Sequence, residues 1–141
     1  TALDVGHGQF HASLAADPRV TYIEGLNARD LTAADLGGRL PDLVVCDVSF
    51  ISLKLALPPA LALAAPGAAA VLLVKPQFEV GREGIGKGGI VRDPHLGERA
   101  AADIAAWLEA DIGWRVGGVI LSPIEGGDGN REFLLGGVKD E

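Results

Sequence analysis

Short apolar runs alternate with amphipathic or alanine-rich segments along most of the chain, a pattern typical of parallel strands linked by crossover helices. Apolar runs of strand length predict strands at residues 1–5, 20–24, 43–47, 68–75, 115–121 and 132–138. Helices are predicted at residues 9–16, 53–65 and 94–111, with at most a short helical turn at 33–36. The chain of 141 residues therefore fits one α/β domain.

Two of the predicted strands end on an ionisable residue, and both runs are apolar enough to be buried. The run 43–47 ends on Asp47, and the run 68–75 ends on Lys75. Ligands of open α/β sheets bind at strand ends, so the pattern brings an acid and a base to one edge of the sheet. Each residue also has a simpler explanation, because Asp47 could cap the next helix and Lys75 could extend to water.

Four segments resemble the motifs of a known family, in matching order and spacing. They are Asp47-Val48-Ser49-Phe50-Ile51-Ser52-Leu53, Val74-Lys75-Pro76-Gln77-Phe78-Glu79, Gly86-Lys87-Gly88-Gly89-Ile90-Val91-Arg92-Asp93-Pro94 and Gly129-Asn130-Arg131-Glu132-Phe133-Leu134. The family is hemolysin A (TlyA), S-adenosylmethionine-dependent ribosomal RNA 2'-O-methyltransferases of the FtsJ-like class. The resemblance implies a Rossmann-like methyltransferase fold, with a mostly parallel sheet and an antiparallel last strand. It also implies S-adenosyl-L-methionine as cofactor and ribosomal RNA in ribosomal subunits as substrate, at a cytidine if the family's preference carries over.

The resemblance covers only part of a family member. Family members begin with a small basic RNA-binding domain of the S4 type, followed by a first strand and a glycine-rich loop that hold the cofactor. This chain starts at Thr1, contains no Met and shows neither feature. We therefore interpret residues 1–141 as a methyltransferase domain truncated at its N-terminus.

The resemblance also implies a catalytic set. Related 2'-O-methyltransferases use a Lys-Asp-Lys-Glu group, of which Asp47, Lys75 and Glu132 match the last three members, while the first lysine would precede Thr1. Methyl transfer to a ribose hydroxyl requires alignment of the reactants and removal of a proton from a weakly acidic alcohol, which a lysine oriented by carboxylates can assist. Without the resemblance, Glu132 would be interpreted as an ordinary acid opening an apolar strand.

Four residues are candidates for binding the cofactor. Asp4 ends the first predicted strand, where a carboxylate commonly accepts hydrogen bonds from ribose hydroxyls. A helix cap or a turn acid is the alternative for Asp4. The resemblance places Asn27 and Ala28 beside the adenine, although ordinary loop hydrogen bonding would also explain them. We expect Asp47 to contribute to cofactor binding as well.

A glycine-rich loop is predicted over residues 78–92. In the family this segment borders the active site, so Arg82, Lys87 and Arg92 are candidates for contacts with RNA phosphates. The spacing of this loop also fits a phosphate-binding P-loop, but Gly88 replaces the Ser or Thr after Lys87 and no helix follows directly. An ordinary surface loop is the other alternative.

The charge balance and hydropathy limit the partners. The chain has 19 acidic and 12 basic residues and a net charge of −7, whereas an RNA-binding surface needs Lys and Arg. A separate basic module would reconcile this charge with an RNA substrate. No apolar run is long enough to span a bilayer, so we expect a soluble, cytoplasmic protein without membrane contact.

The remaining reactive residues favour structural roles. Cys46, the single cysteine, lies in an apolar run and is interpreted as a buried structural thiol. His7 and His11 are four residues apart, but no third ligand lies nearby in the sequence, so no metal site is predicted and both are placed on an exposed helix face. Trp107 is predicted to lie in the core.

Two other functions stay open. One is a non-catalytic RNA- or protein-binding module that keeps the methyltransferase fold. The other is a membrane-active hemolysin, although the sequence contains neither an amphipathic basic helix nor a spanning segment.

If the first strand lies outside residues 1–141, two strand edges are exposed. We therefore expect this fragment alone to bind S-adenosylmethionine weakly or not at all, and to be able to form homo-oligomers through those edges. Equilibrium binding of the cofactor measures this. A dissociation constant close to that of the full-length gene product would contradict the expectation.

Overall fold

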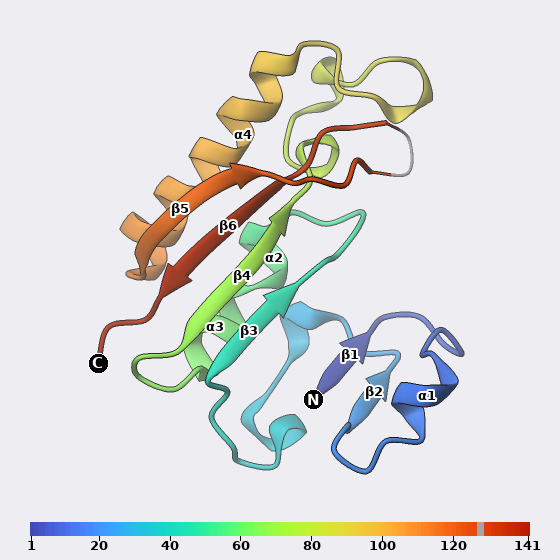
Figure 1. Ribbon diagram of the computed structural model, residues 1–141, viewed down its shortest axis with the longest axis vertical. Helices are drawn as coiled ribbons and strands as arrows, with labels where there is room; N and C mark the ends of the chain where they lie inside the picture. The colour runs from blue at the N-terminus through green and yellow to red at the C-terminus, as the bar shows by residue number, and fades with distance from the viewer. Residues whose placement is uncertain (127–128) are drawn as a thin grey trace.

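The computed structural model describes residues 1–126 and 129–141, in which strands and helices alternate along the chain (Figure 1). The strands are β1 (Ala2–Asp4), β2 (Tyr22–Glu24), β3 (Leu43–Cys46), β4 (Ala69–Val74), β5 (Arg115–Leu121) and β6 (Phe133–Val138). The α-helices are α1 (Ala12–Ala15), α2 (Leu53–Ala56), α3 (Pro58–Leu63) and α4 (Pro94–Trp107). Short 3-10 helices are η1 (Ala28–Asp30), η2 (Ala33–Leu36), η3 (Pro76–Phe78), η4 (Arg82–Gly84) and η5 (Lys87–Gly89), and α4 continues into the π-helical turn η6 (Leu108–Ile112).

The strands form two hydrogen-bonded groups. β1 and β2 pair in parallel, and the other four strands form a sheet of order β3-β4-β6-β5. Within that sheet β3 and β4 are parallel, whereas β6 runs antiparallel to both β4 and β5. The predicted α/β class and the antiparallel last strand are therefore confirmed, in a sheet that is mixed.

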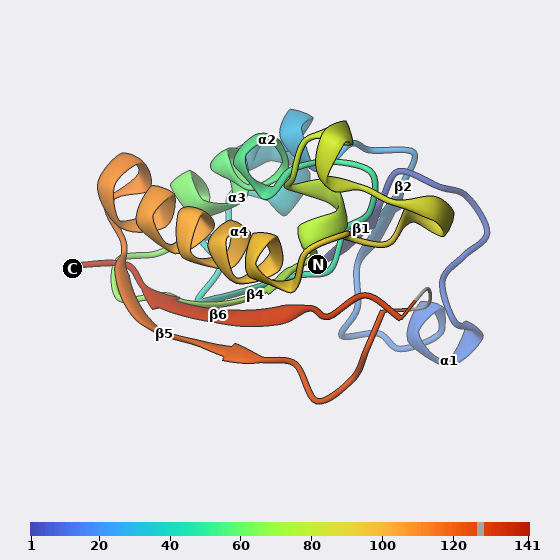
Figure 2. The ribbon, with the colours of Figure 1, turned by 90° about the horizontal axis from the view of Figure 1, so that it is seen from above.

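The helices α2, α3 and α4 lie on one face of the four-stranded sheet (Figure 2). Alternate residues of β4 are buried against them, namely Ala70, Leu72 and Val74. Helices cover only one face of β3. On its other face Leu43 is 58% exposed and Val45 is 70% exposed. The prediction that residues 43–47 and 68–75 form buried strands is therefore wrong for one face of each, because Val71 of β4 is also 45% exposed and successive side chains of a strand point to opposite sides.

The helix predicted at residues 9–16 is shorter in the structure. Helix α1 begins only after His11, whose ring nitrogen accepts a hydrogen bond from the Ser13 N–H at 3.2 Å. His7 lies outside α1, and its ring packs against Gly25. The two histidines therefore do not share a helix face, which corrects that prediction.

The helix predicted at residues 53–65 is divided into α2 and α3. Pro58 has no N–H and a fixed φ, so it suits the first position of a new helix better than the interior of a long one. The helix predicted at residues 94–111 is confirmed as α4 and η6, and Asp93 caps it by accepting the His95 N–H at 2.9 Å. Trp107 is buried in the core, as predicted.

The carboxyl end of α3 is capped by Lys139, the residue after β6. Its Nζ donates hydrogen bonds to the carbonyl oxygens of Leu61, Ala62 and Ala64 at 3.1, 3.1 and 2.8 Å. Carbonyls at a helix end lack partners within the helix, and a positive charge there also interacts favourably with the helix dipole. This contact connects the last strand to the helical layer.

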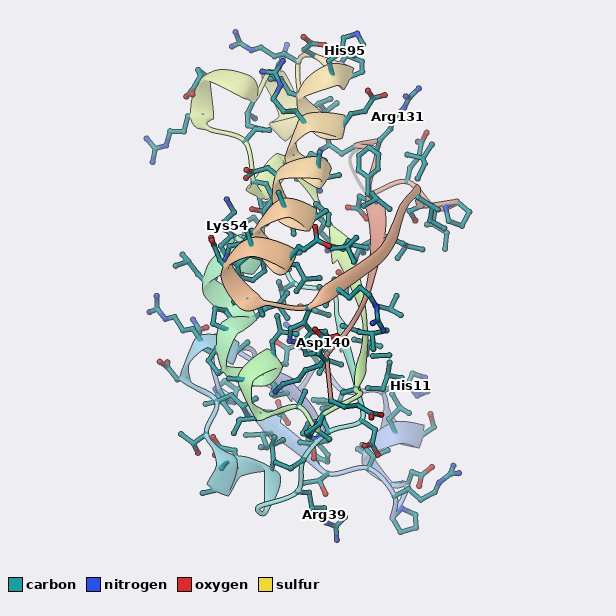
Figure 3. All side chains as sticks on the ribbon, turned by 90° about the vertical axis from the view of Figure 1, so that its left-hand side faces the viewer. His11, Arg39, Lys54, His95, Arg131 and Asp140 are labelled. Atoms are coloured by element: carbon teal, nitrogen blue, oxygen red, sulfur yellow. The ribbon has the colours of Figure 1, made fainter. Side chains whose placement is uncertain are left out.

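We expect Lys139→Met to lower the free energy of unfolding by about 1 to 2 kcal/mol, because Met keeps the apolar stem and removes the three hydrogen bonds. Urea unfolding followed by circular dichroism measures this. Arg39→Met is the control, because Arg39 is exposed (Figure 3) and its replacement should change stability by less than about 0.5 kcal/mol. Equal losses in the two variants would show that the cap contributes nothing.

Candidate functional site

A cleft of about 1180 Å³ is formed by the segments that follow β1, β2, β3 and β4. The carboxyl ends of parallel strands meet at one edge, so the loops after β1 and β2 lie together, as do the loops after β3 and β4, and both pairs of loops line this cleft. The four residues predicted to bind the cofactor all line this cleft, as does one of the predicted RNA-binding residues: they are Asp4, Asn27, Ala28, Asp47 and Arg82.

Asp47 and Lys75 meet at this edge as the sequence predicted. The Asp47 Oδ1 lies 2.5 Å from the Lys75 Nζ, which also donates a hydrogen bond to the Ser49 hydroxyl at 3.2 Å. The Lys75 side chain is 14% exposed and that of Asp47 is 69% exposed, so the lysine stem is buried while its ion pair lies at the surface of the cleft. Helix α2 is capped by Ser52 rather than by Asp47. The geometry therefore excludes the capping explanation for Asp47, whereas a buried lysine stem beside an exposed carboxylate agrees both with a lysine that extends toward water and with a catalytic one.

Glu132 directly precedes β6. In the antiparallel pair of β4 and β6, Val74 lies opposite Phe133, so the next position along places Lys75 opposite Glu132. It is 7% exposed, so it is not an ordinary edge acid. Its Oε2 accepts a hydrogen bond from the Gln77 Nε2 at 3.1 Å. The ends of β3 and β4 and the start of β6 thus bring together the three predicted catalytic residues, with Gln77 as an additional contact that the sequence did not indicate.

Asp4 and Asn27 both make local hydrogen bonds beside the cleft. The Asp4 Oδ1 accepts the Gly6 N–H at 2.8 Å, and the Asn27 Oδ1 accepts the Arg29 N–H at 3.1 Å. The alternative roles considered for these residues, a turn acid and a loop hydrogen bond, are therefore observed. A carboxylate has further acceptor capacity after one such bond, so the turn role of Asp4 leaves it able to bind a ligand hydroxyl.

Phe50 has the most unusual conformation in the cleft. Its φ of 64° is the only positive φ of a non-glycine residue in the described part of the chain, and its side chain is 90% exposed. The ring lies 5.0 Å from that of Phe78, measured between centroids. A left-handed backbone at a bulky residue costs about 1 to 3 kcal/mol, and such strain concentrates at functional sites. Sequence reasoning missed this feature, because no neighbouring residue type signals it.

The loop predicted over residues 78–92 is held by hydrogen bonds to its surroundings. Ile85 and Val91 form an antiparallel bridge. The buried Asn130 side chain accepts the Val91 N–H and donates to the Gly89 carbonyl oxygen, both at 3.0 Å. Asn130 is thus a structural residue of the last motif that the sequence did not single out.

The same loop places the three predicted RNA-binding residues differently. Arg82 lines the cleft, whereas the Arg92 Nε donates to the Ile85 carbonyl oxygen at 3.1 Å and so uses part of its guanidinium within the loop. Lys87 begins the 3-10 helix η5, and the next α-helix begins only at Pro94. The P-loop alternative is therefore wrong, because that motif requires a helix N-terminus at its lysine.

Cys46, the single cysteine, is half-buried at the end of β3. Burial raises the pKa of the Cys46 thiol to about 11, helped by the negative charge of Asp47, which agrees with the predicted structural role. In residues 1–126 and 129–141, no group of three or more His, Cys, Asp or Glu residues is arranged to hold a metal ion. Within the same residues, none of the helices has the length and apolarity needed to cross a membrane.

Comparison with known proteins identifies relatives for nearly the whole chain. The model of the FtsJ-like methyltransferase family matches residues 1–139. The 16S/23S rRNA (cytidine-2'-O)-methyltransferase TlyA of Mycobacterium tuberculosis is 48% identical over 134 residues, which cover 95% of this chain and 49% of that protein. The solved structure of a proposed hemolysin from Streptococcus thermophilus is 42% identical with a TM-score of 0.91, over 99% of this chain and 50% of that one.

A more distant solved structure supports the fold alone. The N-methyltransferase NodS of Bradyrhizobium japonicum is 14% identical with a TM-score of 0.57, over 99% of this chain and 72% of that one. The chain spans about half the length of the curated relatives it matches, which include a Bacillus subtilis protein of which it covers 47%. The region matched by the family model includes the whole cleft, Lys75 and Glu132. The chain therefore belongs to the FtsJ-like methyltransferases and, among them, to the TlyA (hemolysin A) family.

Proposed function

We propose that this protein methylates the 2'-hydroxyl of a ribose in ribosomal RNA, at a cytidine as the name of the Mycobacterium tuberculosis relative states for that protein. The observation that carries the proposal is the Asp47–Lys75 ion pair at the end of two parallel strands, beside a cleft large enough for a cofactor. Membership of the FtsJ-like family supports the same reaction.

The residues of the cleft fit S-adenosyl-L-methionine. Asp4 offers carboxylate oxygen for ribose hydroxyls, residues 26–28 offer backbone and apolar surface for the adenine, and Asp47, after β3, lines the same cleft. The volume of about 1180 Å³ slightly exceeds that of a typical small-molecule site, which leaves room for part of a nucleotide. When bound, the cofactor supplies a methyl group that its positive sulfonium activates.

The polar contacts of Lys75 suit it to act on the ribose hydroxyl. Asp47 and Ser49 hold its Nζ in one orientation, so that a neutral amine can accept the proton that the hydroxyl loses, or an ammonium can stabilise the alkoxide oxygen that forms when the proton leaves to water. Glu132, held by Gln77, supplies a second carboxylate on the neighbouring strand. In this proposal Lys75 acts on the substrate, while Asp47 and Glu132 set the charge and orientation around it.

The RNA would be held by an aromatic ring and by three cations. Phe50 presents an exposed ring, backed by Phe78, on which a base can stack. Arg82 at the cleft and Lys87 and Arg92 on the adjoining loop are proposed to contact phosphates. These cations provide local positive charge in a chain whose net charge is −7.

We expect Lys75→Ala in the full-length gene product to slow methyl transfer to ribosomal subunits by about 100- to 10,000-fold, because it removes the group that handles the proton. Cofactor affinity should change by less than about threefold. Incorporation of labelled methyl and equilibrium cofactor binding measure the two effects.

Arg19→Ala is the matched control for this prediction, because Arg19 is also ion-paired, at 2.8 Å from Asp17, but lies outside the cleft lining. Equal rates for the two variants would remove Lys75 from the mechanism. If the unmodified protein transfers no label to naked RNA, to subunits or to whole ribosomes, a non-catalytic binding module becomes the better explanation.

We expect Phe50→Ala to raise the KM for the RNA substrate by about 10- to 100-fold, since stacking of one base contributes about 1 to 3 kcal/mol. Phe50→Tyr should retain most of the affinity, because it keeps an aromatic face. The 90% exposure of Phe50 predicts that neither change alters the free energy of unfolding by more than about 1 kcal/mol. Steady-state kinetics and urea unfolding test this, and an unchanged KM for Phe50→Ala would rule out the stacking role.

A further inference from the structure

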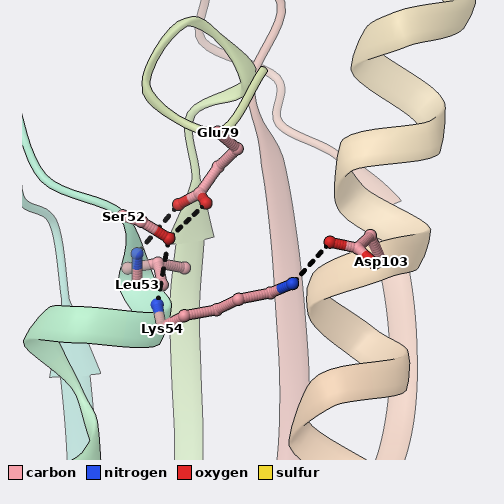
Figure 4. Close-up of polar contacts among 5 residues, drawn as sticks. All are labelled: Ser52, Leu53, Lys54, Glu79 and Asp103. Atoms are coloured by element: carbon pink, nitrogen blue, oxygen red, sulfur yellow. Dashed lines mark hydrogen bonds and ion pairs between the residues drawn. The ribbon is translucent and has the colours of Figure 1, made fainter. Parts of the chain in front are cut away.

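The side chain of Glu79 connects two loops of the cleft. Its Oε2 accepts the Ser52 hydroxyl at 2.6 Å, and its Oε1 accepts the Leu53 N–H at 2.8 Å (Figure 4). Glu79 follows η3 after β4, whereas Ser52 and Leu53 begin α2 after β3. One carboxyl group thus joins residues that are 26 and 27 positions away in the sequence.

These two bonds complete the N-terminus of α2. The first N–H groups of a helix have no partner within it, and here Glu79 accepts from Leu53 while the Ser52 hydroxyl oxygen accepts from Lys54 at 3.2 Å. A helix of four residues is not stable by itself. Its position therefore depends on Glu79, on the buried Leu53 and on the Lys54 ion pair with Asp103 of α4.

Glu79 makes the last of three sets of contacts between residues 75–79 and residues 47–53. Lys75 contacts Asp47 and Ser49, the ring of Phe78 contacts that of Phe50, and Glu79 contacts Ser52 and Leu53. The contacts follow the chain in order on both sides, so that residues 75–79 run alongside residues 47–53. The strained backbone of Phe50 lies between the first and the last of these contacts, and such strain persists only where the flanking structure enforces it.

The environment of Glu79 shows that its burial has an energetic cost. Burial raises the pKa of its carboxyl group, while the hydrogen bonds from Ser52 and Leu53 and the charge of Lys54 act against this, and the charge of Asp103 adds to it. The two hydrogen bonds to the start of α2 offset part of that cost.

We propose that Glu79 is a positioning residue for methyl transfer, whose carboxyl group fixes residues 47–53 against residues 75–79 and so holds Phe50 and Asp47 in their places in the cleft. This inference rests on the proposed function. Glu79 acts through these residues, because its two oxygens bond to Ser52 and Leu53. Its role depends on the length of the side chain and on two hydrogen-bonding atoms rather than on charge.

The test is a series of substitutions in the full-length gene product. Glu79→Ala removes both bonds, and Glu79→Asp is one methylene too short to make them, so each should lower kcat/KM for ribosomal subunits by about 10- to 100-fold. Glu79→Gln should stay within about fivefold of the unmodified protein, because its oxygen can accept from Leu53 and its NH₂ group can donate to Ser52. Cofactor affinity should change by less than about threefold across the series.

Hydrogen–deuterium exchange provides a readout that does not depend on activity. The Leu53 amide and the amides of residues 48–52 should exchange at least about tenfold faster in Glu79→Ala and Glu79→Asp than in Glu79→Gln. Glu109→Ala is the control for loss of an exposed carboxylate, and Lys139→Met is the control for general destabilisation at a distant helix end. Both controls should leave kcat/KM and exchange of residues 48–53 unchanged.

The outcomes separate this inference from the proposed function. Unchanged exchange in Glu79→Ala would overturn the inference, and so would faster exchange with unchanged kcat/KM. A loss of activity in Glu79→Gln as large as in Glu79→Ala would show that charge matters rather than positioning. If the unmodified protein shows no methyl transfer, the proposed function fails. In that case RNA affinity is the remaining readout, and an unchanged affinity in Glu79→Ala would overturn the positioning role as well.

Discussion

The burial of β4 is the constraint on which the rest of the structure depends. One face of this strand is covered by helices, and its edges pair with β3 and β6, so its position is determined on three sides. Lys75 follows directly, and the buried Pro76, which lacks an N–H, ends the strand there. Lys75 therefore emerges between the ends of two neighbouring strands, where Asp47 and Glu132 lie.

The loops of the cleft are ordered by polar side chains rather than by regular secondary structure. Asp47 contacts Lys75, Glu132 contacts Gln77, and Glu79 contacts the start of α2. In each contact a carboxylate from one segment accepts from a donor on another, so these side chains fix the loops against one another. This arrangement places irregular backbone on a rigid sheet, which is how binding and catalytic residues are commonly held.

Predictions from local sequence succeeded where one physical effect dominates. Apolar runs of strand length locate the strands, and a charged residue ending such a run locates the functional edge, which is why Asp47 and Lys75 were predicted as neighbours. Local reasoning was wrong where tertiary packing decides. It extended α1 over residues that do not form a helix, and it treated β3 as buried on both faces although Val45 is exposed.

The sequence by itself determined the α/β class, the order of the elements and the acid and base at the strand ends, because hydrophobic periodicity and strand termination depend on neighbouring residues. It also carried the family motifs. Only the tertiary structure decided the conformation of Phe50 and the partners of Gln77 and Glu79, since these depend on contacts between residues 26 to 55 positions apart and on strain that those contacts enforce.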